Sequence, residues 1–270
     1  MPPLVIHRRD ALNTGDMSSC PAQYFTWLKD AEVIDIVDVR QYDLTDRDVI
    51  LGGGGLFYDP FAPFLKHILM SNTRSLTLWG IGRNHHEEHG PLRDPDGFCR
   101  PELTQKIIDK ADMVGIRDQR LDPKWVPCPS VFHYSFQHNL FSDSGRGILA
   151  LQHREERFHF PVDPAWKQFT MSGNMRDILT AIDEAEVVLS SSYHGCLWAS
   201  WMGKKVIAVD RFSQKFRTGL PESVASLRSS DLSDLDSVLS SITPQDRLLE
   251  QAKMRGFAFA FDVAKLVKKH

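Results

Sequence analysis

Short apolar runs alternate with helix-like stretches along this chain, and this alternation restricts its possible folds more than any other feature. Each run is bounded by glycine or charged residues. Such runs are typical of strands buried on both faces of a parallel sheet, joined by crossover helices. We therefore predict strands at 33–39, 49–51, 76–79, 113–116, 148–152, 187–189 and 206–209. Helices are predicted at 104–110, 172–185 (capped by Ser172), 194–202, 232–239 and 244–267. This order indicates an α/β fold with parallel sheets and right-handed crossovers.

A connector-like stretch divides the pattern into two parts. Pro127-Cys128-Pro129 is followed by Asn139–Gly147, which is rich in Ser, Asp and Gly, and the strand pattern restarts at Ile148. A chain of 270 residues is long enough for two modest cores. We predict two Rossmann-like domains, at residues 1–140 and 141–270.

Composition excludes several classes of protein. Hydrophobic residues make up 42% and charged residues 25% of the chain, which is typical of a globular protein rather than a disordered or fibrous one. The net charge of −3 gives no support for nucleic-acid binding. The four cysteines form no CxxC pair, so reduced thiols are expected. With no signal-like or membrane-spanning apolar segment, we expect a cytoplasmic protein.

The loops after the predicted strands are the natural place for a site, because ligands of parallel α/β sheets bind at the carboxyl ends of strands. The glycine run Gly52–Gly55 could bind an anion through its N–H groups or form a tight turn against a neighbouring domain. Phe57 rules out a dinucleotide fingerprint in this run. The six loops to inspect are 52–59, 80–89, 117–120, 153–157, 190–194 and 210–217.

Three histidines after Gly80-Ile81-Gly82 raise the question of a metal site. His85 and His89 are spaced as on a metal-binding helix, but His86 stands where a metalloprotease has glutamate. Gly90 and Pro91 argue against a long helix here. We favour a polar loop and expect no metal.

The segment from Val187 to Ala199 is the most informative one. A strand delivers three serines and then His194 at the start of a helix, where Ser191 or Ser192 could cap the helix. The N–H groups of a helix N-terminus favour an anion, and the helix dipole would lower the pKa of His194 and keep it neutral. The alternative is a capping histidine without chemistry.

Cations follow several strands. Arg117 precedes Asp118 at a strand end, where it could form a loop-fixing ion pair or hold a carboxylate or phosphate. Arg154 and Arg157 occupy the equivalent place in the second half. Residues 204–217 hold five cations against one acid. This stretch is either a solvated face or a site for an anionic donor.

These motifs, in their order along the chain, resemble the polysaccharide pyruvyl transferase family over roughly residues 11–210. They are Asn13-x-Gly15-Asp16, Gly52–Gly55, Gly80-Ile81-Gly82, Ile116-Arg117-Asp118, Ser192-Tyr193-His194-Gly195 and Gly203-Lys204-Lys205-Val206. The resemblance implies a fold similar to GT-B glycosyltransferases, with two Rossmann-like domains whose parallel sheets face a cleft. It implies transfer of pyruvate from phosphoenolpyruvate to sugar hydroxyls of a cell-surface polysaccharide or glycolipid precursor, usually as a ketal.

The resemblance also implies partners and residues. The expected partners are phosphoenolpyruvate, as donor substrate and not cofactor, and a nucleotide- or lipid-linked glycan precursor; a lipid-linked one would bring the protein to the membrane periphery. In the family an Arg-x-His triplet opens the helix of the second domain; His194 matches its histidine and Ser192 replaces its arginine. We expect His194 to be the catalytic acid/base. Donor-binding residues are expected at Arg117, Arg154, Ser191, Ser192, Tyr193, Gly195, Lys204 and Arg211. Acceptor-binding residues are expected at Asn13, Asp16, Gly53, Gly54, Gly55 and Arg83.

Two other functions fit the same features. A GT-B glycosyltransferase would place the diphosphate of a nucleotide sugar at the helix N-terminus and the basic loop. A binding module would keep the fold without turnover.

Overall fold

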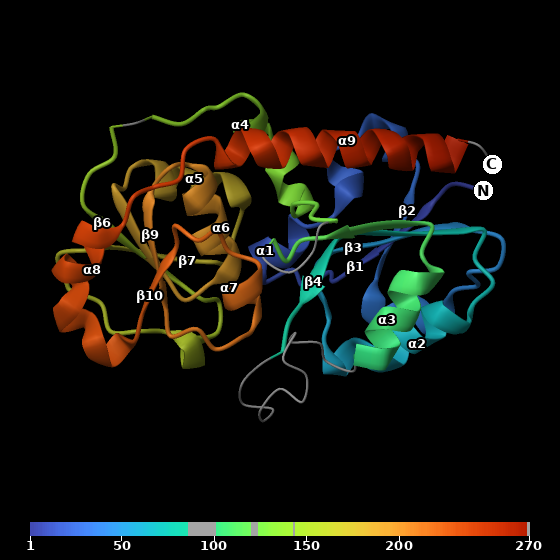
Figure 1. Cartoon of the computed structure of the whole chain (residues 1–270), viewed down its shortest axis with the longest axis horizontal. Coiled ribbons are helices and arrows are strands. Elements are labelled where there is room, and N and C mark those ends of the chain that lie inside the picture. The colour runs from blue at the N-terminus through green and yellow to red at the C-terminus, as the bar shows by residue number, and fades with distance from the viewer. Residues whose placement is uncertain (86–100, 120–123, 143, 269–270) are drawn as a thin grey trace.

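Two parallel five-stranded sheets lie side by side in the computed structural model (Figure 1), which describes residues 1–85, 101–119, 124–142 and 144–268. The first sheet has the strand order β2-β1-β3-β4-β5 and the second has the order β10-β9-β8-β6-β7. All of their pairings are parallel. The predicted α/β fold class is therefore confirmed.

The first sheet is built from residues 4–116. Its strands are β1 (Leu4–His7), β2 (Glu32–Asp35), β3 (Asp48–Phe57), β4 (Ser75–Arg83) and β5 (Met113–Ile116). The strand expected over 33–39 ends early, because the Asp35 carboxylate accepts a hydrogen bond from the Val37 N–H and starts a 3-10 turn over Ile36–Gln41. The strand expected over 33–39 therefore ends at Asp35, because the Asp35 side chain caps the turn that follows.

The glycine motifs lie inside strands, which corrects the expectation that they form loops. β3 continues through Gly52–Gly55, and β4 includes Gly80 and Gly82. The two strands pair along this stretch, with Gly52 opposite Trp79 and Gly54 opposite Ile81. A Cβ on Gly52 would stand 2.2 Å from the Trp79 carbonyl oxygen, so only glycine lets these backbones approach so closely.

The second sheet is built from residues 148–227. Its strands are β6 (Ile148–Gln152), β7 (Lys167–Thr170), β8 (Val187–Ser190), β9 (Lys205–Val209) and β10 (Ala225–Leu227). β7 and β10 lie at the sheet edges and were not predicted. β7 is largely exposed and polar, so it lacks the apolar run that indicates a buried strand.

The two sheets have the same topology. Numbered within its own half, each sheet has the strand order 2-1-3-4-5, in which the order reverses between the first and third strands. Open α/β sheets bind ligands at the carboxyl ends of the strands beside this reversal. In this chain the relevant loops are those after β1 and β3 in one half and after β6 and β8 in the other.

Helices flank both sheets, and one of them spans the two halves. α9 (Leu248–Lys268) runs along one side of the molecule and spans both halves (Figure 1). Its Phe259 ring packs edge-on against the Trp79 ring of β4, with the ring centres 5.5 Å apart. None of the described helices is long and apolar enough to cross a membrane. The others are α1 (Thr14–Met17), α2 (Ala62–Met70), α3 (Pro101–Lys110), α4 (Tyr134–Gln137), α5 (Met175–Asp183), α6 (Tyr193–Trp201), α7 (Lys215–Thr218) and α8 (Leu235–Ser241).

The largest apolar cluster joins the two halves. It includes Trp79 from the first sheet, Phe132 from the connecting segment and Trp198 from α6. The indole N–H of Trp198 donates to Ser130 Oγ at 3.0 Å, which satisfies its polar atom inside this core. The domain boundary between residues 140 and 141 stays a prediction.

Candidate active site

A cavity of about 240 Å³ lies where the carboxyl ends of the two sheets meet. Each of the six loops selected from the sequence contributes at least one residue to its wall. The first half contributes Arg8, Asp10, Asn13, Asp16, Gly55, Leu56, Tyr58, Phe61, Asn84 and Arg117, and the second half contributes His153, Arg154, Glu155, Arg157, Ser192, Tyr193, His194, Phe212 and Lys215. Five of these side chains are cationic and three are carboxylates, so the cavity favours an anion.

Arg117 is the buried cation of this cavity. It follows β5 and is 3% exposed, and its side chain lies across Gly82, where a Cβ would stand 2.5 Å from Nε. The guanidinium carbon lies 4.5 Å from the centre of the Tyr193 ring. Within the described part of the chain, Nε and Nη1 have no hydrogen-bond partner. A buried guanidinium left in this state is set up to hold an anion.

Asp118 does not neutralise Arg117. Its carboxylate accepts from the Arg83 N–H at 2.9 Å and the Thr218 hydroxyl at 2.7 Å, and it lies 3.5 Å from the Arg83 guanidinium. Of the two alternatives for Arg117, the ion pair with Asp118 is not found among the described residues, because Asp118 pairs with Arg83 instead. Arg83 is buried behind the cavity wall, so the structure does not bring it to the cavity with the other expected acceptor residues.

Lys215 is a second cation of the cavity, and it was not singled out from the sequence. It begins α7, and its Nζ lies 5.5 Å and 6.0 Å from the ring centres of Phe212 and Phe216. Among the described residues, no hydrogen bond or ion pair involves this ammonium. Burial, with the nearby charge of Arg117, lowers the pKa of Lys215 to about 8. The only sequence signal was its membership of the cationic stretch 204–217.

His194 lies at the start of α6 and lines the cavity from the second half. Its ring packs against Gly15 of α1, where a Cβ would stand 2.1 Å from Nδ1. Burial, followed by the charges of Arg117 and Lys215, holds the pKa of His194 well below its usual range. Burial and the two neighbouring cations therefore favour the neutral imidazole that the sequence analysis expected from the helix dipole.

The serines before His194 do not cap α6 as expected. Ser192 occupies the N-cap position without a side-chain capping bond, and it lines the cavity. Ser191 is fully buried, and its hydroxyl oxygen accepts from the His153 N–H at 2.9 Å. Tyr193 also lines the cavity, with its hydroxyl donating to the Gly219 carbonyl at 3.1 Å.

Asn13 and Asp16 form the cavity wall contributed by α1. Asn13 Oδ1 accepts from the Asp16 N–H at 3.3 Å, and Asn13 Nδ2 donates to Asp16 Oδ2 at 2.9 Å. Burial raises the pKa of Asp16, although the charges of Lys215 and Arg117 oppose the shift. Both residues were expected on the acceptor side, and the structure places them opposite the residues of the second half.

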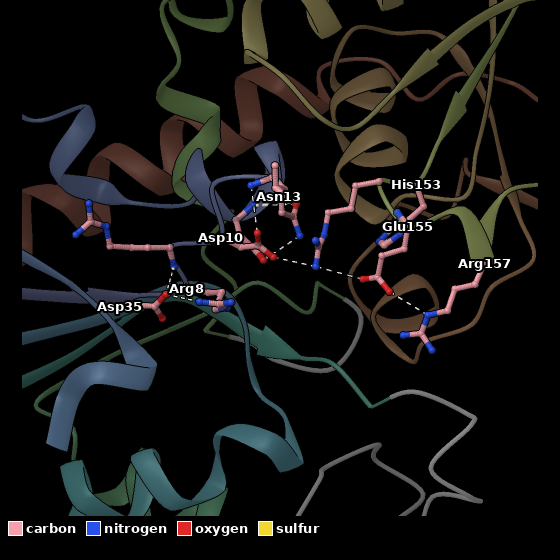
Figure 2. A network of polar contacts seen from close by, with 11 residues as sticks. Arg8, Asp10, Asn13, Asp35, His153, Glu155 and Arg157 are labelled. Atoms are coloured by element: carbon pink, nitrogen blue, oxygen red, sulfur yellow. Dashed lines mark hydrogen bonds and ion pairs between the residues drawn. The ribbon is translucent and has the colours of Figure 1, made fainter.

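A chain of ion pairs crosses the cavity mouth from one half to the other (Figure 2). Arg154 Nη2 lies 2.8 Å from Asp10 and 3.2 Å from Glu155, and Arg157 Nε donates to Glu155 at 2.9 Å. On the first-half side, Arg8 pairs with Asp35. Arg154 therefore lines the cavity as expected, but two carboxylates already compensate its charge.

Of the four predicted glycines, only Gly55 lines the cavity. Gly55 lines the cavity, and a Cβ there would stand 3.0 Å from Arg117 Nη2. Gly53 and Gly54 lie just before it in β3. Gly195 lets α6 pack closely, since a Cβ there would stand 2.5 Å from Ser190 Oγ.

Two expected donor cations lie elsewhere. Lys204 is buried just before β9, where its ammonium donates to the carbonyl of Asp183 at the end of α5 at 2.8 Å. Arg211 lines a separate hollow, with its guanidinium donating to the Val224 carbonyl at 3.3 Å. The structure therefore does not bring either cation to the cavity.

The histidines considered for a metal site fall partly outside the described residues, which include His85 but not His86 or His89. Over the described ranges, no group of three or more His, Cys, Asp or Glu side chains is arranged to hold a metal ion.

Comparison with known proteins gives a family match. A model of the polysaccharide pyruvyl transferase family matches residues 13–213, whereas no curated protein matches the sequence. Among solved structures, the chain is similar to an uncharacterised protein of Klebsiella pneumoniae, with 14% identity and a TM-score of 0.47 over 77% of this chain and 83% of that one. It is also similar to UDP-GlcNAc 2-epimerase from Neisseria meningitidis, with 8% identity and a TM-score of 0.42 over 99% and 100% of the two chains. A glycosyl transferase family 9 protein from Veillonella parvula shows 10% identity and a TM-score of 0.27 over 96% and 97%.

Proposed function

Because the chain belongs to the polysaccharide pyruvyl transferase family and is therefore a transferase, we propose that it moves pyruvate from phosphoenolpyruvate onto two hydroxyls of a sugar. The acceptor is a nucleotide- or lipid-linked precursor of a cell-surface polysaccharide or glycolipid, and the product is a ketal. We place the reaction in the cytoplasm. The three described cysteines support that location, because all are buried free thiols.

The observation that carries this proposal is a pair of cations in one cavity, Arg117 and Lys215, neither of which forms an ion pair with a carboxylate in the described part of the chain. Phosphoenolpyruvate bears a carboxylate and a phosphate on one small carbon skeleton. A guanidinium and an ammonium that make no ion pair with any described carboxylate match such a ligand in charge, and the planar guanidinium can bind either group through two hydrogen bonds. Together they supply the positive charge that Ser192 lacks in place of the family's arginine.

The chemistry can be assigned to these groups step by step. The oxygen of the first sugar hydroxyl attacks C2 of phosphoenolpyruvate, and His194, neutral at pH 7, accepts the proton of this hydroxyl. His194 then passes the proton to the methylene carbon, which becomes a methyl group. The C–O bond to phosphate then breaks, with Arg117 and Lys215 stabilising the departing charge. The second hydroxyl attacks C2 and loses its proton to the phosphate, which closes the ketal. Asn13 and Asp16 hydrogen-bond the sugar.

Ligand-dependent thermal stability tests this assignment against a nucleotide-sugar donor. We expect phosphoenolpyruvate to raise the melting temperature, and Arg117→Met to abolish that rise. The matched control is Lys205→Gln, since Lys205 belongs to the same cationic stretch but pairs with Glu186 away from the cavity. Stabilisation by nucleotide sugars alone would show a glycosyltransferase instead.

A further inference from the structure

His194 is held from the side of its Nε2 atom by two small side chains of the first half. Nε2 lies 3.5 Å from Ser19 Oγ and 3.6 Å from Cys128 Sγ. All three residues are buried. The proton on a neutral imidazole occupies one ring nitrogen only, and the neighbours of each nitrogen decide which one.

The Ser19 hydroxyl donates its only hydrogen to a backbone carbonyl. Ser19 Oγ lies 2.7 Å from the Gly15 carbonyl oxygen, which can only accept. The Ser19 backbone is fixed as well, because its carbonyl accepts from the Gly53 N–H at 2.9 Å. A serine hydroxyl that donates to Gly15 can offer only lone pairs to His194.

The remaining hydrogens can then be assigned without conflict. A hydroxyl oxygen accepts up to two hydrogen bonds, and Ser19 Oγ has two further neighbours, His194 Nε2 and Cys128 Sγ, the latter at 3.3 Å. Both act as donors if Nε2 carries the imidazole proton. Placing that proton on Nδ1 would instead set two lone pairs against each other between Nε2 and Ser19 Oγ, and would leave Nε2 with only the Cys128 thiol, a weak donor at 3.6 Å, as its hydrogen-bond partner.

We propose that Ser19 is a positioning residue for His194, holding its imidazole with the proton on Nε2 and leaving Nδ1 as the nitrogen that accepts a proton. Nδ1 is the ring atom that lies against Gly15. This inference also explains one role of the glycine run, since the Gly53 N–H holds the backbone of Ser19, which orients His194. The use of Nδ1 in catalysis rests on the proposed function, whereas the location of the proton does not.

Nitrogen-15 NMR of the histidine rings, recorded without substrate, tests the location of the proton. His194→Gln identifies the signals of His194 by their loss. We expect a protonated Nε2 and an unprotonated Nδ1 in the unmodified protein, and a mixture of both forms in Ser19→Ala. A proton on Nδ1 in the unmodified protein overturns the proposal, and so do unchanged His194 signals in Ser19→Ala. The measurement on the unmodified protein decides the matter even if the variant does not fold.

Two variants separate this effect from general damage. Ser18→Ala removes a neighbouring buried hydroxyl that bonds the Thr14 carbonyl and lies 3.3 Å from the Gly15 carbonyl. Among the described residues no hydrogen bond joins it to His194, so this variant should leave the His194 signals in place. Cys128→Ala should also leave Nε2 protonated, and loss of that proton would contradict the assignment.

Kinetics then test the consequence for catalysis. In Ser19→Ala we expect kcat for phosphoenolpyruvate-dependent phosphate release to fall about tenfold with little change in KM, as when a histidine loses its orienting partner. An unchanged kcat overturns the positioning role. If the unmodified protein turns over no phosphoenolpyruvate while Nε2 carries the proton, the proposed function fails and the NMR result stands.

Discussion

The imidazole of His194 lies directly on Gly15, so that a methyl group at Gly15 would stand 2.1 Å from Nδ1. The two residues come from opposite halves of the molecule, one from α1 and the other from α6. The cavity thus owes its geometry to contact between the halves. A glycine is needed at position 15 because the ring occupies the place of a side chain.

Gly15→Ala should displace His194 and disable the site. A misplacement of about 1 Å is enough to cost about 100-fold in rate, so we expect kcat to fall by about that factor. Overpacking should lower stability by about 1–3 kcal/mol, which urea unfolding measures. Gly203→Asn is the control, because position 203 is exposed, nothing lies near its Cβ direction and asparagine tolerates its positive φ. Full activity in Gly15→Ala would contradict this placement of His194.

Arg117→Met should weaken the binding of phosphoenolpyruvate while preserving the apolar contacts of the side chain with Gly82. A hydrogen bond to a charged group contributes about 1.5–3 kcal/mol, so the Kd from titration calorimetry should rise about 10- to 100-fold. Lys205→Gln should leave the Kd unchanged. Equal affinity in the unmodified protein and Arg117→Met would show that the donor binds elsewhere.

Donor affinity should decrease at alkaline pH because of Lys215. Its pKa of about 8 lies below its ordinary value, so the ammonium is charged below about pH 8 and loses its charge above it. A bound anion favours the charged form, so the Kd should be nearly constant below about pH 8 and rise about tenfold per pH unit above it. Lys215→Met should bind weakly with no such rise. An equally steep rise in that variant would assign the titration to another group.

Phe259 should be a main anchor of α9. Its ring contacts Trp79 and also lies beside Gly115, where a Cβ would stand 3.0 Å from it. We expect Phe259→Ala to lower the free energy of unfolding by about 2–3 kcal/mol, slightly less than for a fully buried phenylalanine. Phe261→Ala is the matched control on the same helix, since Phe261 is 63% exposed and should change stability by less than about 0.5 kcal/mol. Equal losses in both variants would rule out this packing of α9.

The sequence predicted the location of the cavity better than its residues. Because strands of a parallel sheet bring their carboxyl ends to one edge, all six selected loops reached the cavity wall. Lys204 and Lys215 belong to the same cationic stretch, yet only Lys215 lines the cavity, and nothing in the local sequence distinguishes them. That difference arises from tertiary packing, which places Lys204 against Asp183.

The glycine motifs show a similar limit. Their conformational freedom was evident from the sequence, but their partners were not. Gly82 and Gly55 make room for Arg117, and Gly53 holds the backbone of Ser19. These contacts join residues far apart in the chain, so no local pattern reveals them. β7 was not predicted for a different reason: its residues are polar, and it lies at a sheet edge.

The most direct test of the proposed function is to incubate the protein with phosphoenolpyruvate and a panel of nucleotide- and lipid-linked sugars and to analyse both products. We expect one phosphate released for each pyruvyl group gained by the sugar. Because a ketal and an enol ether have the same mass, proton NMR must identify the product, and we expect a methyl singlet without vinyl signals. His194→Gln should abolish the reaction. Sugar transfer from a nucleotide sugar, with no pyruvyl group gained by any acceptor, would contradict the proposed function.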